Sequence, residues 1–189
     1  MTFRVFGYGS LVNRRTLPPH LGIEHATVRG WRRAWRATSR GASGGVCSLS
    51  VLPDAASAID GVIVTFEDDV WPLIRRREHN YDPLRLQEEP DVIIFRANAE
   101  ADRFGDGHHP IHLSYIDVAI QGFLEEFGHD GVRRFMETTD GWHVPIVDDR
   151  LAPGYPRAQL LSAEEIQCVD EMLESVDATP LRPQESRSA

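Results

Sequence analysis

The sequence predicts an α+β fold, in which a small mixed β-barrel carries packed helices. Strand-like segments rich in Val, Ile, Trp and Ser dominate residues 3–97, whereas apolar residues at helical spacing dominate the last third. Runs of strands followed by runs of helices are typical of this class. We expect one domain over residues 1–178 and a polar, disordered tail over residues 179–189.

The first strand is expected at residues 3–8, and it ends in the glycine-punctuated turn Gly7-Tyr8-Gly9-Ser10. The further strands are expected at residues 26–38, 45–53, 59–66, 84–88 and 92–97. The glycine-rich stretch 40–45 is expected to be a flexible loop between two of these strands, and the polar stretch 100–112 another loop.

A short helix is expected at residues 70–78, with Asp68 or Asp69 as its cap and Pro72 in the first turn. Two further helices follow at residues 130–136 and after Ser162, which forms a capping box with Glu165.

The longest helix is expected before these two, with Ser114 as its cap, and it runs through Phe127 and is stopped by Gly128. Its apolar face has helical spacing and consists of Ile116, Ile120, Phe123, Leu124 and Phe127.

The composition argues against several functional classes. The chain has 189 residues and a formal net charge of −9, which argues against nonspecific nucleic-acid binding. No apolar run reaches the length of a membrane span, and the N-terminus lacks the pattern of a signal peptide. The only cysteines are Cys47 and Cys168, so we expect no disulfide framework and a reducing, cytoplasmic location.

Two motifs are candidates for chemistry. The first is Tyr8-Gly9-Ser10-Leu11, because a strand that ends in glycine leaves backbone N–H groups open to a carboxylate or an oxyanion. Asn13 could start a helix behind it and add a favourable dipole. An ordinary tight turn is the alternative interpretation.

The second motif is Glu78, which follows three arginines and precedes Tyr81 by three residues. A partly buried glutamate has a raised pKa and can transfer protons near neutral pH, and Tyr81 would then orient it or its substrate. A solvated surface charge is the alternative interpretation.

Other polar residues carry weaker signals. His108, His109 and His112 share one polar stretch but lack partners at metal-ligand spacing, so we expect no metal site there. Ser10 as a hydrolase nucleophile would need the second glycine of a nucleophile elbow and a partnered histidine.

Together these segments resemble the gamma-glutamylcyclotransferase superfamily, and they are most similar to its ChaC-like branch. Residues 6–12 (FGYGSLV) look like the family's substrate-binding loop, and residues 28–41 are similar to the arginine- and aromatic-rich strand after it. Residues 77–81 (REHNY) look like the segment that carries the catalytic glutamate, and residues 114–128 resemble the family's long helix. ChaC-like proteins often have one more residue between the glutamate and the tyrosine, and residues 138–159 lie outside the shared pattern.

The resemblance implies a mixed α/β fold around a small β-barrel, no cofactor, and cyclisation of glutathione or a related gamma-glutamyl substrate to 5-oxoproline. Glu78 would be the general acid and base. The alternatives are a gamma-glutamylamine cyclotransferase and a noncatalytic gamma-glutamyl-binding module of the same fold. The oligomeric state stays open.

We assign the two ends of the substrate to different groups. Its α-amino acid end would contact Tyr8, Gly9, Ser10 and Leu11, with Tyr81 and Tyr115 beside them. The distal carboxylate of glutathione would pair with Arg40.

Overall fold

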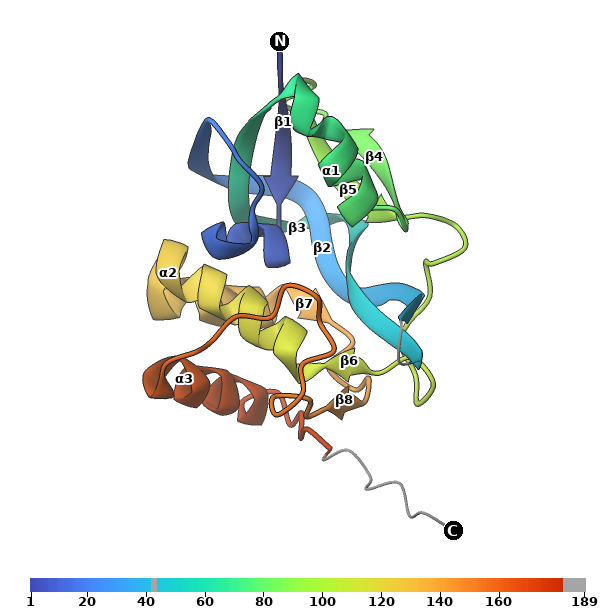
Figure 1. Cartoon of the computed structure of the whole chain (residues 1–189), viewed down its shortest axis with the longest axis vertical. Coiled ribbons are helices and arrows are strands. Elements are labelled where there is room, and N and C mark those ends of the chain that lie inside the picture. Colours follow the sequence, from blue (N-terminus) through green and yellow to red (C-terminus); the bar gives the residue numbers. More distant parts are fainter. Residues whose placement is uncertain (42–43, 182–189) are drawn as a thin grey trace.

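The computed structural model describes residues 1–41 and 44–181. Within these residues, eight strands form one mixed sheet and three α-helices accompany it (Figure 1). The first elements are β1 (Thr2–Gly7), β2 (Gly22–Gly41), β3 (Gly44–Glu67), α1 (Trp71–Arg77), β4 (Tyr81–Arg85) and β5 (Val92–Ala97). The later elements are β6 (Ile111–His112), α2 (Leu113–Glu137), β7 (Thr139–Asp140), β8 (Ile146–Val147) and α3 (Ala163–Glu174). The predicted α+β class is confirmed.

The sheet follows the order β4-β5-β1-β3-β2-β7, and β6 pairs with both β3 and β8. The pairs β1–β3, β2–β3 and β4–β5 are antiparallel, whereas β1–β5 and β2–β7 are parallel. The sheet is therefore mixed, as expected. Among the strands of the described residues no pairing joins β4 to β7, so a closed barrel stays a prediction.

The centre of the sheet is one long hairpin, where the sequence predicted three shorter strands. β2 and β3 pair out to Gly41, which lies opposite Gly44. The register shifts twice along β2, and Gly30 has a positive φ of 79° at the first shift. Such bulges bend a long strand without ending its pairing. Residues 40–41 and 44–45 of the predicted loop therefore belong to strands, with Arg40 in β2, and residues 42–43 lie outside the described residues.

The strand predicted at residues 84–88 is displaced toward the N-terminus, because β4 starts at Tyr81. Tyr81 lies opposite Ala97 and Arg85 lies opposite Ile93, so β5 sets the position of β4. Pro83 weakens the strand signal in the sequence, but β4 is an edge strand, where proline is tolerated.

Two helix predictions hold with one correction each. α1 has Pro72 in its first turn, but Asp68 and Asp69 form a short 3-10 turn before it and no side chain caps the helix. α2 begins at Leu113, so Ser114 is not its cap. The Ser114 N–H and hydroxyl instead donate to the carboxylate of Asp149, at 2.8 and 2.6 Å.

The C-terminal helix α3 packs against α2, on the side of α2 opposite to β1 (Figure 1). The helices predicted at residues 114–128 and 130–136 form the two parts of α2. Gly128, with φ 64°, leaves the helical conformation and produces a kink between them. The capping box of Ser162 and Glu165 at the start of α3 is confirmed. The Leu181 N–H donates to the Ile146 carbonyl at 2.8 Å, so the third residue of the predicted tail is hydrogen-bonded to β8, and residues 182–189 lie outside the described residues.

The structure also bears on membrane association. In residues 1–41 and 44–181 we find no helix with the length and apolar character needed to cross a bilayer.

Candidate active site

Two adjoining cavities, of about 270 and 30 Å³, lie where β1 and α1 end. They share the residues Ser10, Glu78, Tyr81 and Tyr115. All eight residues singled out from the sequence line one or both cavities: Tyr8, Gly9, Ser10, Leu11, Arg40, Glu78, Tyr81 and Tyr115. The fold thus brings together residues that are up to about a hundred positions apart in the chain, while their roles stay predictions.

Glu78 is positioned by the end of α1. The helix ends at this residue, whose N–H still donates to the Ile74 carbonyl at 2.9 Å. The Tyr81 N–H donates to the Glu78 carbonyl at 3.0 Å, and this hydrogen bond closes a tight turn that carries both residues. The Glu78 side chain is only 13% exposed. It is therefore not the solvated surface charge of the alternative interpretation.

Burial raises the pKa of Glu78, because desolvation disfavours the ionised carboxylate. The positive charges of Arg77, Arg157, His79 and Arg75 oppose this shift, Arg77 most strongly. A carboxyl group whose pKa lies above its ordinary value can both accept and return a proton near neutral pH.

Arg77 is a site residue that the sequence analysis missed. It donates to the Ser10 hydroxyl at 3.0 Å and to the Thr16 carbonyl at 2.8 Å, and so joins α1 to the turn after β1. Its Nε lies 3.2 Å from Glu78 Oε1 but is not aligned for a hydrogen bond, and it has no other partner in the described residues. The spacing from buried Ile74 would have indicated Arg77, since i and i+3 share a helix face.

The turn at residues 8–11 is held from two sides. The Tyr8 hydroxyl donates to the Phe95 carbonyl at 2.6 Å, and the Tyr8 carbonyl accepts from Arg33 Nε at 2.7 Å. A Cβ on Gly9 would lie 3.1 Å from the Tyr115 hydroxyl oxygen, so glycine permits this close approach. The expected helix behind Asn13 is only a 3-10 turn of three residues, Arg14–Thr16, so its dipole is much smaller than that of a full helix.

Arg33 is the second residue that the sequence analysis missed. Its side chain is fully buried and donates to Tyr8, to the Thr138 hydroxyl at 2.6 Å and to the Asp60 carbonyl. The guanidinium also lies 4.9 Å from the Phe123 ring centroid, and burial lowers its pKa to about 9. The spacing from Trp35 would have indicated Arg33. The two residues are two positions apart in β2, so their side chains lie on the same face of the strand, and Trp35 is buried.

The two other tyrosines of the site are buried or half-buried. Tyr81 donates to the Leu49 carbonyl at 2.7 Å, and Tyr115 packs edge-on against Trp35 with ring centroids 5.7 Å apart. Burial raises the pKa of both hydroxyls, so they stay protonated at neutral pH.

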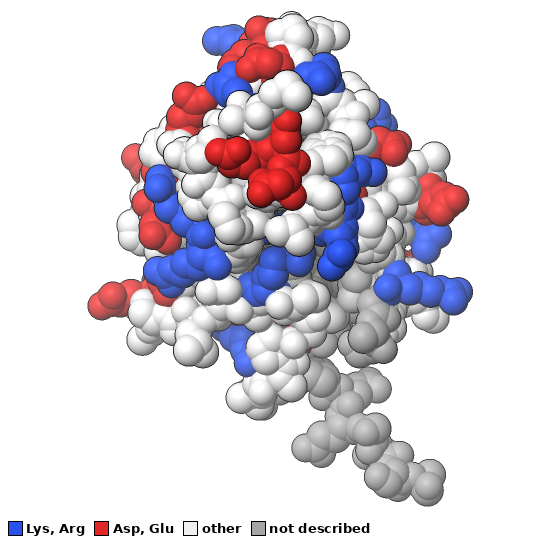
Figure 2. Space-filling model, turned by 45° about the horizontal axis from the view of Figure 1, so that its top comes forward, with Lys and Arg blue, Asp and Glu red and all other residues white. Residues whose placement is uncertain are grey.

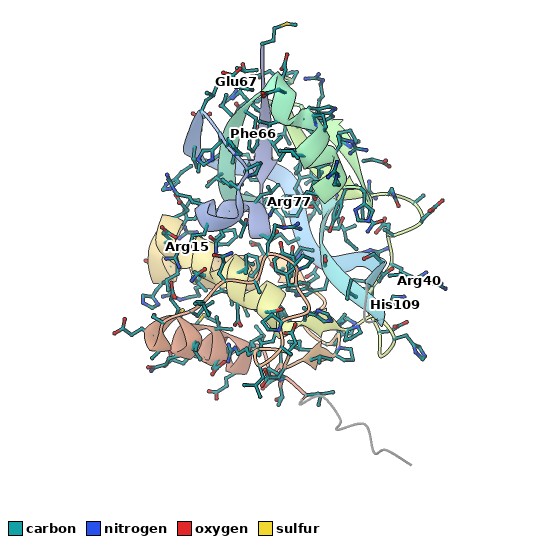
Figure 3. All side chains as sticks on the ribbon, in the orientation of Figure 1. Arg15, Arg40, Phe66, Glu67, Arg77 and His109 are labelled. Carbon is teal, nitrogen blue, oxygen red and sulfur yellow. The ribbon has the colours of Figure 1, made fainter. Side chains whose placement is uncertain are left out.

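The outer wall of the larger cavity is basic. Arg40 is exposed at the end of β2, far from Arg77 near the centre of the molecule (Figure 3). His112 also lines this cavity and lies 3.4 Å from a carboxylate oxygen of Asp149. His109 pairs instead with Asp106 at 3.0 Å, so the histidines do not converge. Within the described residues no three potential metal ligands cluster together.

No protein-family model matches the sequence, and no curated protein matches it in sequence. Solved structures do match. One named gamma-glutamyl cyclotransferase has a TM-score of 0.55 and 10% identity, covering 90% of this chain and 99% of that chain. The chain has the gamma-glutamyl cyclotransferase fold.

Two further structures support this fold. An uncharacterized protein from Homo sapiens has a TM-score of 0.54 and 10% identity, covering 89% of this chain and 98% of that chain. YkqA from Bacillus subtilis has a TM-score of 0.51 and 17% identity, covering 74% of this chain and 56% of that chain. In this chain's version of the gamma-glutamyl cyclotransferase fold, Glu78 and the turn at residues 8–11 face the same cavities.

Proposed function

We propose that the protein is a gamma-glutamyl cyclotransferase of the ChaC-like kind, which acts in the cytoplasm on glutathione or a related gamma-glutamyl compound. One observation carries the proposal. Glu78, a buried carboxyl group with a raised pKa, faces the same cavities as the turn at residues 8–11. The likeness in fold to a structure named gamma-glutamyl cyclotransferase supports it.

The reaction requires no nucleophile from the protein. The substrate's own α-amine attacks its γ-carbonyl carbon and forms the C–N bond of a five-membered ring. The bond from that carbon to the leaving nitrogen then breaks, and the proton lost by the attacking amine ends on the leaving amine. The products are 5-oxoproline and a free amine, and no water is consumed. Well-oriented intramolecular reactions reach effective molarities of about 10⁵ M or more, so holding the substrate folded supplies much of the acceleration.

Glu78 is proposed to carry the proton from the attacking to the leaving nitrogen. The backbone N–H groups of Gly9, Ser10 and Leu11 are proposed to bind the α-carboxylate or the tetrahedral oxyanion, beside the Tyr115 hydroxyl. This division of roles needs only groups that line the two cavities.

A hydrolase with a nucleophilic side chain is disfavoured. The Ser10 hydroxyl accepts a hydrogen bond from Arg77, and no histidine is its partner within the described residues. Cys47 also lines the larger cavity, but burial raises the pKa of its thiol to about 12. It is therefore protonated and a poor nucleophile at neutral pH.

The deciding experiment is an assay of 5-oxoproline over a panel of glutathione, gamma-glutamyl dipeptides and gamma-glutamyl amines. We expect the wild-type protein to form 5-oxoproline and the Glu78→Gln variant to form none above background. Turnover confined to the amines would identify a gamma-glutamylamine cyclotransferase. Binding without 5-oxoproline from any compound would identify a noncatalytic module.

A further inference from the structure

We infer that Arg157 is a specificity-determining residue that binds a carboxylate on the carbon next to the leaving nitrogen of the substrate, a position distinct from the distal carboxylate of glutathione that is assigned to Arg40. The inference rests on the proposed function, and it concerns the end of the substrate that the turn at residues 8–11 does not contact. Arg157 comes from the segment 138–159, outside the pattern shared with ChaC-like proteins. The structure brings this segment to the wall of the larger cavity, which Glu78 also lines.

The Arg157 guanidinium is oriented but still has donors to offer. Its Nε donates to the Tyr155 hydroxyl at 3.2 Å, and its carbon lies 5.1 Å from the centroid of the Tyr155 ring. Among the described residues, its two terminal nitrogens have neither a hydrogen-bond partner nor an ion-pair partner. A guanidinium held over an aromatic ring presents parallel N–H groups, which match the two oxygens of a carboxylate.

The segment that carries Arg157 is anchored to the start of α2. Asp149, only 8% exposed, accepts hydrogen bonds from the N–H and hydroxyl of Ser114 and, at 2.7 Å, from the Gly154 N–H. The Tyr155 N–H donates to the Ser114 hydroxyl at 3.3 Å. Figure 1 shows the coil between β8 and α3 crossing α2, in orange. The guanidinium is therefore presented from a fixed position.

Its place relative to Glu78 indicates which part of the substrate it contacts. Arg157 and Glu78 line the same cavity, and the charge of Arg157 lowers the pKa of Glu78. Glu78 is proposed to give its proton to the leaving nitrogen, so the groups attached to that nitrogen lie in the cavity that Arg157 also lines. A carboxylate on the carbon that bears this nitrogen would complement its charge.

The other basic groups at the cavity are less suited to this role. Arg77 is engaged by Ser10, Thr16 and Glu78, and Arg40 lies at the exposed hairpin end. The larger cavity is nevertheless lined by three arginines and two histidines against one carboxylate, in a chain with a net charge of −9. Figure 2 shows arginines gathered across the middle of one face of the molecule, below a cluster of acidic residues. This local excess of positive charge favours an anionic leaving group.

The test uses two ligands, gamma-glutamylalanine and gamma-glutamylethylamide, which differ only in the carboxylate. Titration calorimetry compares their affinities for Glu78→Gln, which does not turn them over, and for Glu78→Gln with Arg157→Ala. We expect the first protein to prefer gamma-glutamylalanine by about tenfold or more, as for a charge-assisted pair. The second should bind both equally. Arg76→Ala, an exposed arginine of α1 outside the cavity, is the matched control and should keep the preference.

Equal affinities in Glu78→Gln, or a preference that survives Arg157→Ala at an unchanged melting temperature, would overturn the inference. If Arg157→Ala does not fold, Arg157→Gln keeps a planar amide near Tyr155 without the charge and gives the same test. The 5-oxoproline assay answers a separate question. A protein that prefers the carboxylate ligand in binding but forms no 5-oxoproline would refute the proposed function and leave this inference standing.

Discussion

Replacing Glu78 by Gln should remove turnover while leaving the fold and ligand binding in place. Gln has the shape of Glu and keeps a polar group beside Arg77, but it cannot accept and return a proton. General acid–base groups contribute about 10²–10⁴-fold, so kcat should fall by at least about a hundredfold. The contacts of Arg77 with Ser10 and Thr16 do not involve Glu78, so affinity should change by less than about tenfold, the scale of one hydrogen bond.

The pH dependence gives an independent check. Because burial raises the pKa of Glu78, the wild-type kcat/KM should fall, as pH is lowered, at a pH above about 4.3, the ordinary pKa of Glu. A folded-state pKa above the unfolded value stabilises the fold below the unfolded pKa, and this contribution is lost as pH rises through the folded pKa. The Glu78→Gln variant should therefore gain stability relative to wild type as pH rises.

The assay is 5-oxoproline formation from the best substrate of the panel, combined with calorimetric binding and thermal melts between about pH 4 and 8, a range that spans the ordinary and raised pKa values of Glu. A Glu78→Gln variant that folds and keeps a near-normal kcat would refute the assignment of Glu78. A loss of activity accompanied by loss of the melting transition would count as unfolding, and Glu78→Asp would then be compared under the same conditions.

Three further predictions follow from the site. Gly9→Val should abolish turnover of every gamma-glutamyl compound without unfolding, because even a Cβ there lies 3.2 Å from Leu49 Cδ1; activity in the folded variant would contradict this. Arg40→Ala should raise KM for glutathione severalfold and leave KM for gamma-glutamyl amines unchanged. An unchanged preference between the two would show that Arg40 has only a structural role at the end of the hairpin. Exhaustive chelation should leave activity intact, since the cyclisation needs only proton transfer; stoichiometric zinc whose removal abolishes activity would disprove it.

Features that depend on neighbours in the chain could be predicted from the sequence. The strand β5, the loss of helical conformation at Gly128 and the capping box of Ser162 and Glu165 all occur where local patterns indicated them. Each depends on a short run of strand-forming residues, on one backbone conformation or on residues three positions apart. The motifs at residues 8–11 and at Glu78 were also visible, because glycine next to a strand and a glutamate at a helix end are local features.

The tertiary structure decided which of these residues meet and which become buried. Three consecutive arginines precede Glu78, and Arg77 is the one that the folded chain brings to Ser10 and Thr16. Arg33 can be fully buried because its guanidinium is surrounded by hydrogen-bond acceptors and an aromatic ring from segments that are distant in the sequence.

The cavity wall itself is also a product of long-range contacts. Arg157 reaches it because Asp149 binds the start of α2, a contact across 35 positions that no local pattern encodes. Burial also raises the pKa of Glu78, and residues from distant segments, such as Ser10 and Tyr115, line the cavities beside it. A sequence motif states which groups are present, whereas the distances and the exclusion of water that make them reactive arise only when the chain folds.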